Sequence, residues 1–175
     1  GRDYLPKAAT PMTAALTRIR YSEKNSAQVE FFSREDWEII EEKKMEYDRI
    51  IDAEFRREQE KFKANSSKRK EPTRELIESM CKDKIAEELK AAKELVDMYN
   101  NQNLYNEDLF GKTDYIDLDN EFEFSTKLKN YVGASGKYTP LVKNTTLNMN
   151  VVSLKGIEIV DTPGTNDPIL SRGLK

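Results

Sequence analysis

The segment SLKGIEIVDTPGTNDP lies at residues 153–168, near the end of the sequence. Its short apolar run, with Ile157, Ile159 and Val160, predicts a β-strand that stops abruptly at the sequence DTPG, residues 161–164. Asp, Pro and Gly are ordinary turn residues, so DTPG could simply end the strand. The alternative is a ligand site, because open α/β sheets bind ligands at the carboxyl ends of their strands. The apolar run favours the ligand site, on a strand that we expect to be buried.

The residues after this strand suit a nucleoside triphosphate. The Asp161 carboxylate is a hard oxygen ligand for Mg²⁺, usually through a water molecule. Gly164 has no side chain, so its backbone N–H can approach a γ-phosphate closely, and Pro163 fixes one dihedral before it. A strand ending in Asp-x-x-Gly is typical of switch II in P-loop GTPases. We therefore predict a nucleotide-binding set of Asp161, Thr162, Pro163 and Gly164.

Two other motifs of a GTPase are missing from these residues. The phosphate-binding loop reads G-x-x-x-x-G-K-[S/T], and the nearest candidate, NEDLFGKT at residues 106–113, has Asn106 in place of the first Gly. No apolar strand precedes this candidate and a poor helix start follows it, so we reject it. The guanine-reading pattern [N/T]-K-x-D is also absent from the sequence.

The flanking segments predict two β-hairpins of a partial P-loop GTPase-type sheet in an α/β fold. In residues 1–32, a two-residue apolar period around the turn-like EKNS predicts the first hairpin. In residues 101–175, an acidic connector leads to a short helix near 126–131. The second hairpin follows, made of TLNMNVVSL and IEIVD joined at Lys155-Gly156.

Residues 33–100 predict a long α-helical hairpin inserted between these segments. Ser33 and Asp36 form a capping-box-like start, and Pro72 can open the second helix after a break at ANSSKRKEPT. Each helix should contain about 28–30 residues and span about 40–45 Å. We expect the two helices to pack in an antiparallel coiled-coil-like pair. The predicted buried stripes are Trp37, Ile40, Tyr47, Ile51 and Phe55, then Ile77, Met80, Ile85, Leu89, Ala92, Val96 and Tyr99.

Composition limits the possible functions. The 175 residues are 37% hydrophobic and 35% charged, which fits one domain with an excursion. The absence of histidine excludes a catalytic histidine, and the single cysteine, Cys81, fits a reducing cytoplasm. The net charge of −3 gives no support for a nucleic-acid partner. No apolar run approaches the ~20 residues of a membrane span.

Three segments resemble bacterial dynamin-like GTPases. LPKAATPMTAALTRIRYSE, residues 5–23, resembles their switch I region, in which L-P-x-x-x-x-P-x-T-A leads into a T-x-I-R-Y strand. YVGASGKYTPLV and GIEIVDTPGTNDPILSR, residues 131–142 and 156–172, resemble the region that enters switch II. The resemblance is specific over residues 1–32 and 126–172 and weak over the helical middle.

This resemblance implies a GTPase that hydrolyses GTP to GDP with Mg²⁺. It implies that Thr13 is the catalytic switch I threonine, whose hydroxyl ligates Mg²⁺ and whose carbonyl orients the attacking water, with Thr10 as a nearby alternative. It further implies that Asp161 holds the metal through a water molecule and that the Gly164 N–H donates to the γ-phosphate. By the same resemblance we expect self-association through the GTPase face, membrane remodelling, and a cytoplasmic or peripheral membrane location.

We also expect the chain to be an internal fragment. By the resemblance it starts just downstream of the phosphate-binding loop and stops before the guanine-specificity motif, so alone it should be inactive. Two alternatives remain open. The helical hairpin, with its basic SSKRK at residues 66–70, could be a non-catalytic interaction module, or the chain could belong to a pseudo-GTPase. Without the base-reading motif, ATP also remains an alternative to GTP.

Overall fold

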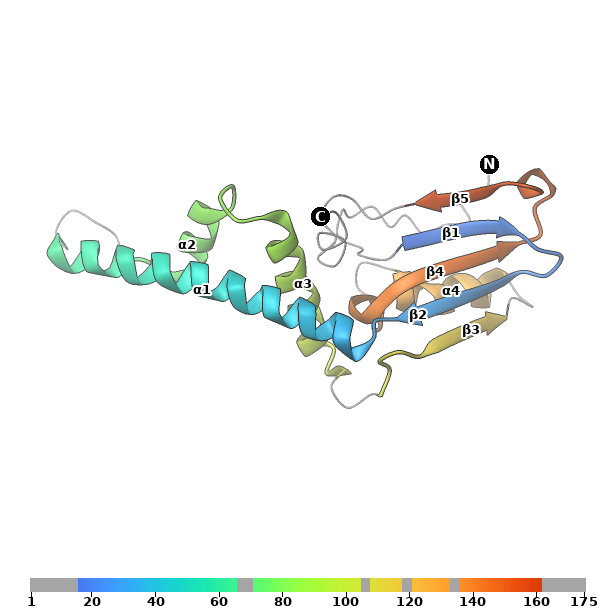
Figure 1. The fold of residues 1–175 in the computed structure, drawn as a ribbon, viewed down its shortest axis with the longest axis horizontal. Helices are drawn as coiled ribbons and strands as arrows, with labels where there is room; N and C mark the ends of the chain where they lie inside the picture. The colour runs from blue at the N-terminus through green and yellow to red at the C-terminus, as the bar shows by residue number, and fades with distance from the viewer. Residues whose placement is uncertain (1–15, 66–70, 105–107, 118–120, 133–135, 162–175) are drawn as a thin grey trace.

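A computed structural model describes residues 16–65, 71–104, 108–117, 121–132 and 136–161 of the chain. In Figure 1 a β-sheet occupies one end of the molecule, and the helix α1 extends away from it. The helices and strands are β1 (Leu16–Tyr21), β2 (Ser26–Phe31), α1 (Arg34–Ala64), α2 (Arg74–Cys81), α3 (Glu87–Asn101), β3 (Thr113–Asp117), α4 (Glu121–Val132), β4 (Val142–Met149) and β5 (Glu158–Asp161). Short 3-10 helices flank β4 at Thr139–Leu141 and Val152–Leu154.

The described strands form a five-stranded mixed sheet in the order β3-β2-β4-β1-β5. β1 runs parallel to β4, and the other neighbouring strands are antiparallel. This sheet with its helices confirms the predicted α/β class. The strands of both predicted hairpins form, but their predicted pairing is wrong: β4 lies between β1 and β2, and β1 lies between β4 and β5. A two-residue apolar period identifies a strand and its core face, but it does not identify the neighbouring strand.

The loop between β1 and β2 passes over the end of β4, which lies between these two strands. The Ser22 N–H donates to the Met149 carbonyl at 3.0 Å. Asn150, just after β4, donates its backbone N–H to Asn25 Oδ1 at 2.6 Å and its side-chain Nδ2–H to the Glu23 carbonyl at 3.1 Å. The turn-like EKNS segment therefore joins two strands across an intervening one.

One face of the sheet carries the hydrophobic core. Alternate residues of β2 and β4 are buried there: Ala27, Val29, Phe31, Thr145, Leu147 and Met149. Leu128 of α4 is buried in the same core, and Figure 1 shows α4 crossing behind the sheet. Tyr131 of α4 also donates to Asp114 Oδ2 on β3 at 3.0 Å. Burial and this hydrogen bond raise the pKa of Tyr131 to about 12.

The opposite face of the sheet is polar. Arg20 on β1 donates from Nε to Asn148 Oδ1 on β4 at 2.7 Å, and Asn148 donates to Ser26 Oγ on β2 at 2.9 Å. Nearby, Asn144 donates to Glu30 Oε2 at 2.8 Å. These cross-strand pairs keep the register of the central strands in step with the core face.

The helical arm, defined here as α1, α2 and α3, begins at the predicted cap. Ser33 Oγ accepts from the Asp36 N–H at 3.0 Å, and Asp36 Oδ2 accepts from the Ser33 N–H at 3.4 Å, which completes a capping box. The predicted apolar stripe of α1 is confirmed, with Trp37, Ile40, Tyr47 and Ile51 buried and Phe55 partly buried. The Trp37 ring lies 4.9 Å from that of Tyr99 on α3, so α3 returns to the base of α1.

The second half of the arm differs from its prediction. In place of one long helix, it contains α2 and α3, separated at residues 82–86. Thr73, and not Pro72, caps α2, because its side chain accepts from the Leu76 N–H. The predicted stripe is buried except for Met80, whose side chain is 54% exposed. Cys81 takes its place in the core.

The acidic connector also contains a strand that its sequence did not predict. β3 pairs with β2 at the sheet edge and buries only Ile116. Its sequence, TDYID, carries a single aliphatic residue, so the apolar alternation of a strand is missing. The helix predicted near 126–131 is present and starts earlier, at Glu121. Among the described helices, none combines the length and apolar character needed to cross a membrane.

Candidate functional site

Asp161 is the last residue of β5, as the sequence predicts. It lies directly opposite Thr17 in the antiparallel pairing of β5 with β1, and its side chain is exposed. Thr17 is the second residue of β1, so β5 ends at the same end of the sheet at which β1 begins. This end of the sheet is the candidate site.

The other predicted site residues lie outside the described part of the chain. Thr13 precedes β1 by three residues, and Thr162, Pro163 and Gly164 follow Asp161 directly. The two segments that carry them therefore join the sheet at adjacent points, one at Leu16 and one at Asp161. The topology thus brings the attachment points of both candidate segments together, although Thr17 and Asp161 are 144 positions apart in the sequence (161 − 17).

β5 is an exposed strand, which corrects the expectation of a buried one. It lies at the end of the strand order, beside β1. Ile159 shares the core face with Ile19, and Val160 shares the polar face with Arg18, yet both are about half exposed, at 48% and 46%. A strand with apolar residues on both faces is typical of a buried sheet position. The sequence of β5 thus predicts that other residues pack on its two faces, and the described residues do not do so.

A row of polar side chains runs from Asp161 into the core. Thr17 is opposite Asp161 on one side and opposite Thr145 of β4 on the other. Val29 of β2 follows Thr145 in the same row, on the core face. Thr145 is fully buried, with 0% of its surface exposed, and its hydroxyl has no hydrogen-bond partner among the described residues. The sequence gives no sign of this row, because it depends on β4 lying beside β1.

The described residues fit a divalent-cation site in which phosphates and water supply most of the ligands. Asp161 contributes a carboxylate with hard oxygen atoms, the ligand type that Mg²⁺ prefers. In the described ranges, at this end of the sheet as elsewhere, no cluster of three or more Asp, Glu, Cys or His side chains could hold a metal. A Mg²⁺ ion usually takes one or two carboxylates and fills its remaining positions with phosphates and water. One exposed carboxylate at this sheet end therefore fits such a site.

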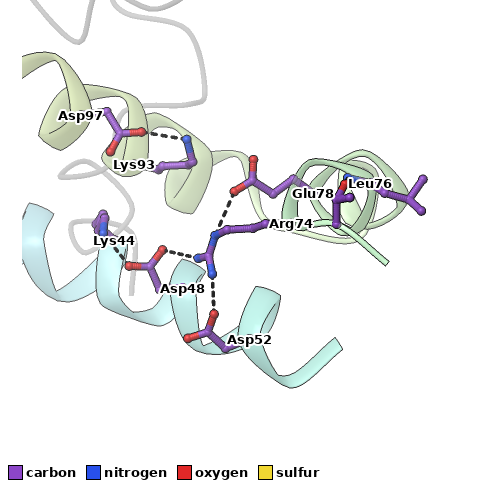
Figure 2. A network of polar contacts seen from close by, with 9 residues as sticks. Lys44, Asp48, Asp52, Arg74, Leu76, Glu78, Lys93 and Asp97 are labelled. Atoms are coloured by element: carbon purple, nitrogen blue, oxygen red, sulfur yellow. Dashed lines mark hydrogen bonds and ion pairs between the residues drawn. The ribbon is translucent and has the colours of Figure 1, made fainter. Parts of the chain in front are cut away.

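The helical arm carries a separate polar cluster, shown in Figure 2. Arg74 of α2 donates to Asp52 at 2.5 Å and to Asp48 at 3.1 Å on α1, and its Nε lies 3.6 Å from Glu78. The hydrogen bond to Asp52 raises the Arg74 pKa, as do the charges of these acids. The same view shows Lys93 of α3 bonded to Asp97 on its own helix. This cluster holds α2 against α1 and lies in the arm, outside the candidate site.

Comparison with known proteins gives the class of the chain. The family model described as Dynamin family matches residues 1–171. The chain therefore belongs to the Dynamin family. That match spans the two segments of the candidate site as well as the helical arm between them.

Solved structures of bacterial dynamins are similar to this chain. One is described as an oligomerised bacterial dynamin pair that provides a mechanism for the long-range sensing and tethering of membranes; it shares 18% sequence identity, with a TM-score of 0.48. A second structure of such a pair also shares 18% identity, with a TM-score of 0.44. Each comparison covers 99% of this chain, which spans about a fifth of the other chain, 19% and 20% respectively. No curated protein matches the chain.

Proposed function

We propose that this chain is part of a dynamin-like GTPase that binds GTP with Mg²⁺ and hydrolyses GTP to GDP. The observation that carries the proposal is the pairing of Asp161 with Thr17, which joins the two candidate segments at one end of the sheet. Membership of the Dynamin family supports it, because the family match includes both segments. The exposed position of Asp161 leaves its carboxylate accessible to a ligand.

The proposed roles follow the chemistry of each residue. Asp161 would hold Mg²⁺ through a water molecule, and Gly164 would donate its backbone N–H to the γ-phosphate. Thr13 would hold Mg²⁺ with its hydroxyl and would orient the attacking water with its carbonyl. In the sequence, Thr13 precedes Thr17 by four residues.

The Mg²⁺ ion, when bound, supplies positive charge that offsets the charge of the phosphates. The chain contributes positioning, since phosphoryl transfer to water needs little covalent chemistry from the protein. A phosphate-binding loop and a guanine-reading motif are not among these 175 residues. We therefore propose that the isolated chain does not hydrolyse GTP and that the full-length protein does.

Further proposals rest on the family alone. We propose that the full-length protein associates with itself through its GTPase face and couples hydrolysis to the remodelling of membranes. Its location would be cytoplasmic, with peripheral contact to a membrane. The division into residues 1–32, 33–100 and 101–175 likewise stays a prediction.

The decisive experiment is a titration of fluorescent GTP in the presence of Mg²⁺, together with measurement of GTP hydrolysis by the full-length protein. We expect Asp161→Ala and Thr13→Ala to lower kcat at least about 100-fold, as loss of a positioned charge or donor does at other active sites. A matched control is Asp117→Ala, which removes the exposed carboxylate at the end of β3 on the opposite edge of the sheet. Its kcat should equal that of the wild type.

Three other results would contradict the proposal. Binding of ATP in preference to GTP would reject the base specificity. Equal losses in Asp161→Ala and Asp117→Ala would show that the site is elsewhere. No binding of either nucleotide by the full-length protein would favour a pseudo-GTPase.

A further inference from the structure

Thr145 presents a problem that the fold alone does not solve. A buried hydroxyl without a partner keeps its full desolvation penalty, and native proteins seldom leave such a group unpaired. An isosteric valine would avoid that cost at the same position. This cost applies in full to Thr145, because none of its surface reaches solvent.

Its neighbours restrict which partner it can find. On the β2 side Thr145 lies opposite Val29, whose side chain offers no hydrogen-bonding atom. On the β1 side it lies opposite Thr17, whose hydroxyl can donate one hydrogen and accept others. A change of the Thr145 χ1 rotamer moves its hydroxyl between staggered positions. Among these cross-strand neighbours, Thr17 is thus the side chain able to pair with it.

Thr17 in turn lies opposite Asp161. Directly opposed residues of antiparallel strands have Cβ atoms about 4.5–5.5 Å apart, so a threonine hydroxyl can reach a facing carboxylate. A carboxylate is acceptor-only, so the hydroxyl of Thr17 donates to it. The Thr17 oxygen is then free to accept from Thr145.

We propose that Thr17 and Thr145 are positioning residues for Asp161. When Mg²⁺ and GTP are bound, Thr145 donates to Thr17 and Thr17 donates to the Asp161 carboxylate, which fixes its orientation. Both hydrogens point toward the carboxylate, so each bond polarises the next. The inference rests on the proposed function of Asp161, and it explains why β4 keeps a buried hydroxyl in this row.

The test uses valine variants of the full-length protein. We expect Thr145→Val to raise the melting temperature without nucleotide, because it removes the unpaired hydroxyl. It should also lower kcat for GTP about two- to tenfold, with KM changed less than about twofold, as expected for one hydrogen bond. The increase in melting temperature caused by Mg²⁺ and GTP should be smaller than in the wild type. Thr145→Ser keeps the hydroxyl and should retain kcat within about twofold, despite its lost methyl group.

A double variant separates this role from general damage. Thr17→Val should lower kcat at least as much as Thr145→Val. Because Thr145 acts through Thr17, the pair of substitutions should cost no more than Thr17→Val alone. The matched control is Thr146→Val, on the same strand but on the polar face, opposite Arg18 and Gln28. This control should keep the wild-type kcat.

The outcomes distinguish the two proposals. If Asp161→Ala abolishes hydrolysis but Thr145→Val has the wild-type kcat and the wild-type response to Mg²⁺ and GTP, the positioning row is refuted and the proposed function stands. Additive losses in the double variant would also refute the row. If the wild-type protein shows no thermal response to Mg²⁺ and GTP, the proposed function and the row are both rejected.

Discussion

Asp36 connects the first turn of α1 to the sheet. Its carboxylate accepts a hydrogen bond from Lys143 Nζ at 2.7 Å, in addition to that from the Ser33 N–H. Burial alone would raise the pKa of Asp36. The hydrogen bond and charge of Lys143, together with the bonds from Ser33, outweigh burial and lower this pKa below its usual value of 3.8. Asp36 is therefore both a helix cap and a link between two parts of the fold.

This lowered pKa makes stability depend on pH. Because the folded pKa is below the unfolded pKa of about 3.9, ionised Asp36 stabilises the fold above that value, and the contribution is lost as pH falls through the folded pKa. We expect Asp36→Asn to lower the free energy of unfolding by about 1–2 kcal/mol at pH 7. The difference from wild type should shrink progressively below about pH 4. Urea unfolding of the chain between pH 7 and pH 2.5 measures it.

Glu35→Gln is the control for this prediction. Glu35 lies in the same first turn of α1 and is exposed. Its substitution should leave a small difference that changes little over the same pH range. A constant difference for Asp36→Asn down to pH 2.5 would show that its charge does not stabilise the fold.

Arg74 links helix α2 to helix α1 through its ion pairs. It contacts acids on both helices, and no other ion pair that the described residues show joins α2 to α1. Its side chain is 45% exposed, so solvent screens these pairs and each contributes little alone. We expect Arg74→Met, which keeps an apolar stem, to cost about 0.5–1 kcal/mol. Amide exchange in residues 74–81 should become faster, with residues 37–51 much less affected.

Salt and a second variant test that assignment. Added salt should speed exchange of α2 in the wild type toward the rate of Arg74→Met, because salt screens exposed charges. Lys90→Met removes an ion pair with Glu87 that lies within α3, so α2 should keep its protection. If α2 exchanges equally fast in the wild type and Arg74→Met, the burial of Ile77 and Cys81 holds it and the ion pairs do not.

Whether a helix boundary can be predicted from the sequence depends on whether the interactions that set it are local. The start of α1 was predictable because Ser33 and Asp36 cap the helix through bonds within one turn. The break after α2 was not, because residues 82–86 contain neither Gly nor Pro. The Lys84 N–H instead bonds to the Cys81 carbonyl at 2.9 Å, in a turn that the packing of α2 and α3 on α1 selects.

The sequence predicts which segments form strands of the sheet better than it predicts the order of those strands. Strands at 16–21 and 26–31 could be expected from alternation, whereas the insertion of β4 between them depends on contacts across more than a hundred residues. The same limit applies to the site. Asp161 stands out in DTPG, but Thr145 acquires its position beside Thr17 only through that strand order. The resemblance to dynamin-like GTPases supplied what local patterns could not, namely the link between the two ends of the chain.

The exposed apolar residues of β5 lead to a prediction for the isolated chain. Ile159 and Val160 of β5 are 48% and 46% exposed, and β5 lies at the end of the strand order among the described strands. An unpaired apolar strand edge readily pairs with another chain. We expect the isolated chain to associate with itself through β5, so that its mass in sedimentation equilibrium rises with concentration. Ile159→Lys should weaken this association about tenfold or more, because it replaces an apolar contact by a charge.

The opposite edge of the sheet provides the control. Tyr115 of β3 is 76% exposed, more than Ile159, so Tyr115→Lys adds the same charge at an accessible position on the other edge. If β5 is the contact, this variant associates as the wild type does, and only Ile159→Lys is monomeric. Equal effects of both substitutions would mean that net charge controls association. If the wild-type chain stays monomeric at high concentration, another part of the chain already covers β5. An uncovered edge would then not explain why β5 has apolar residues on both faces.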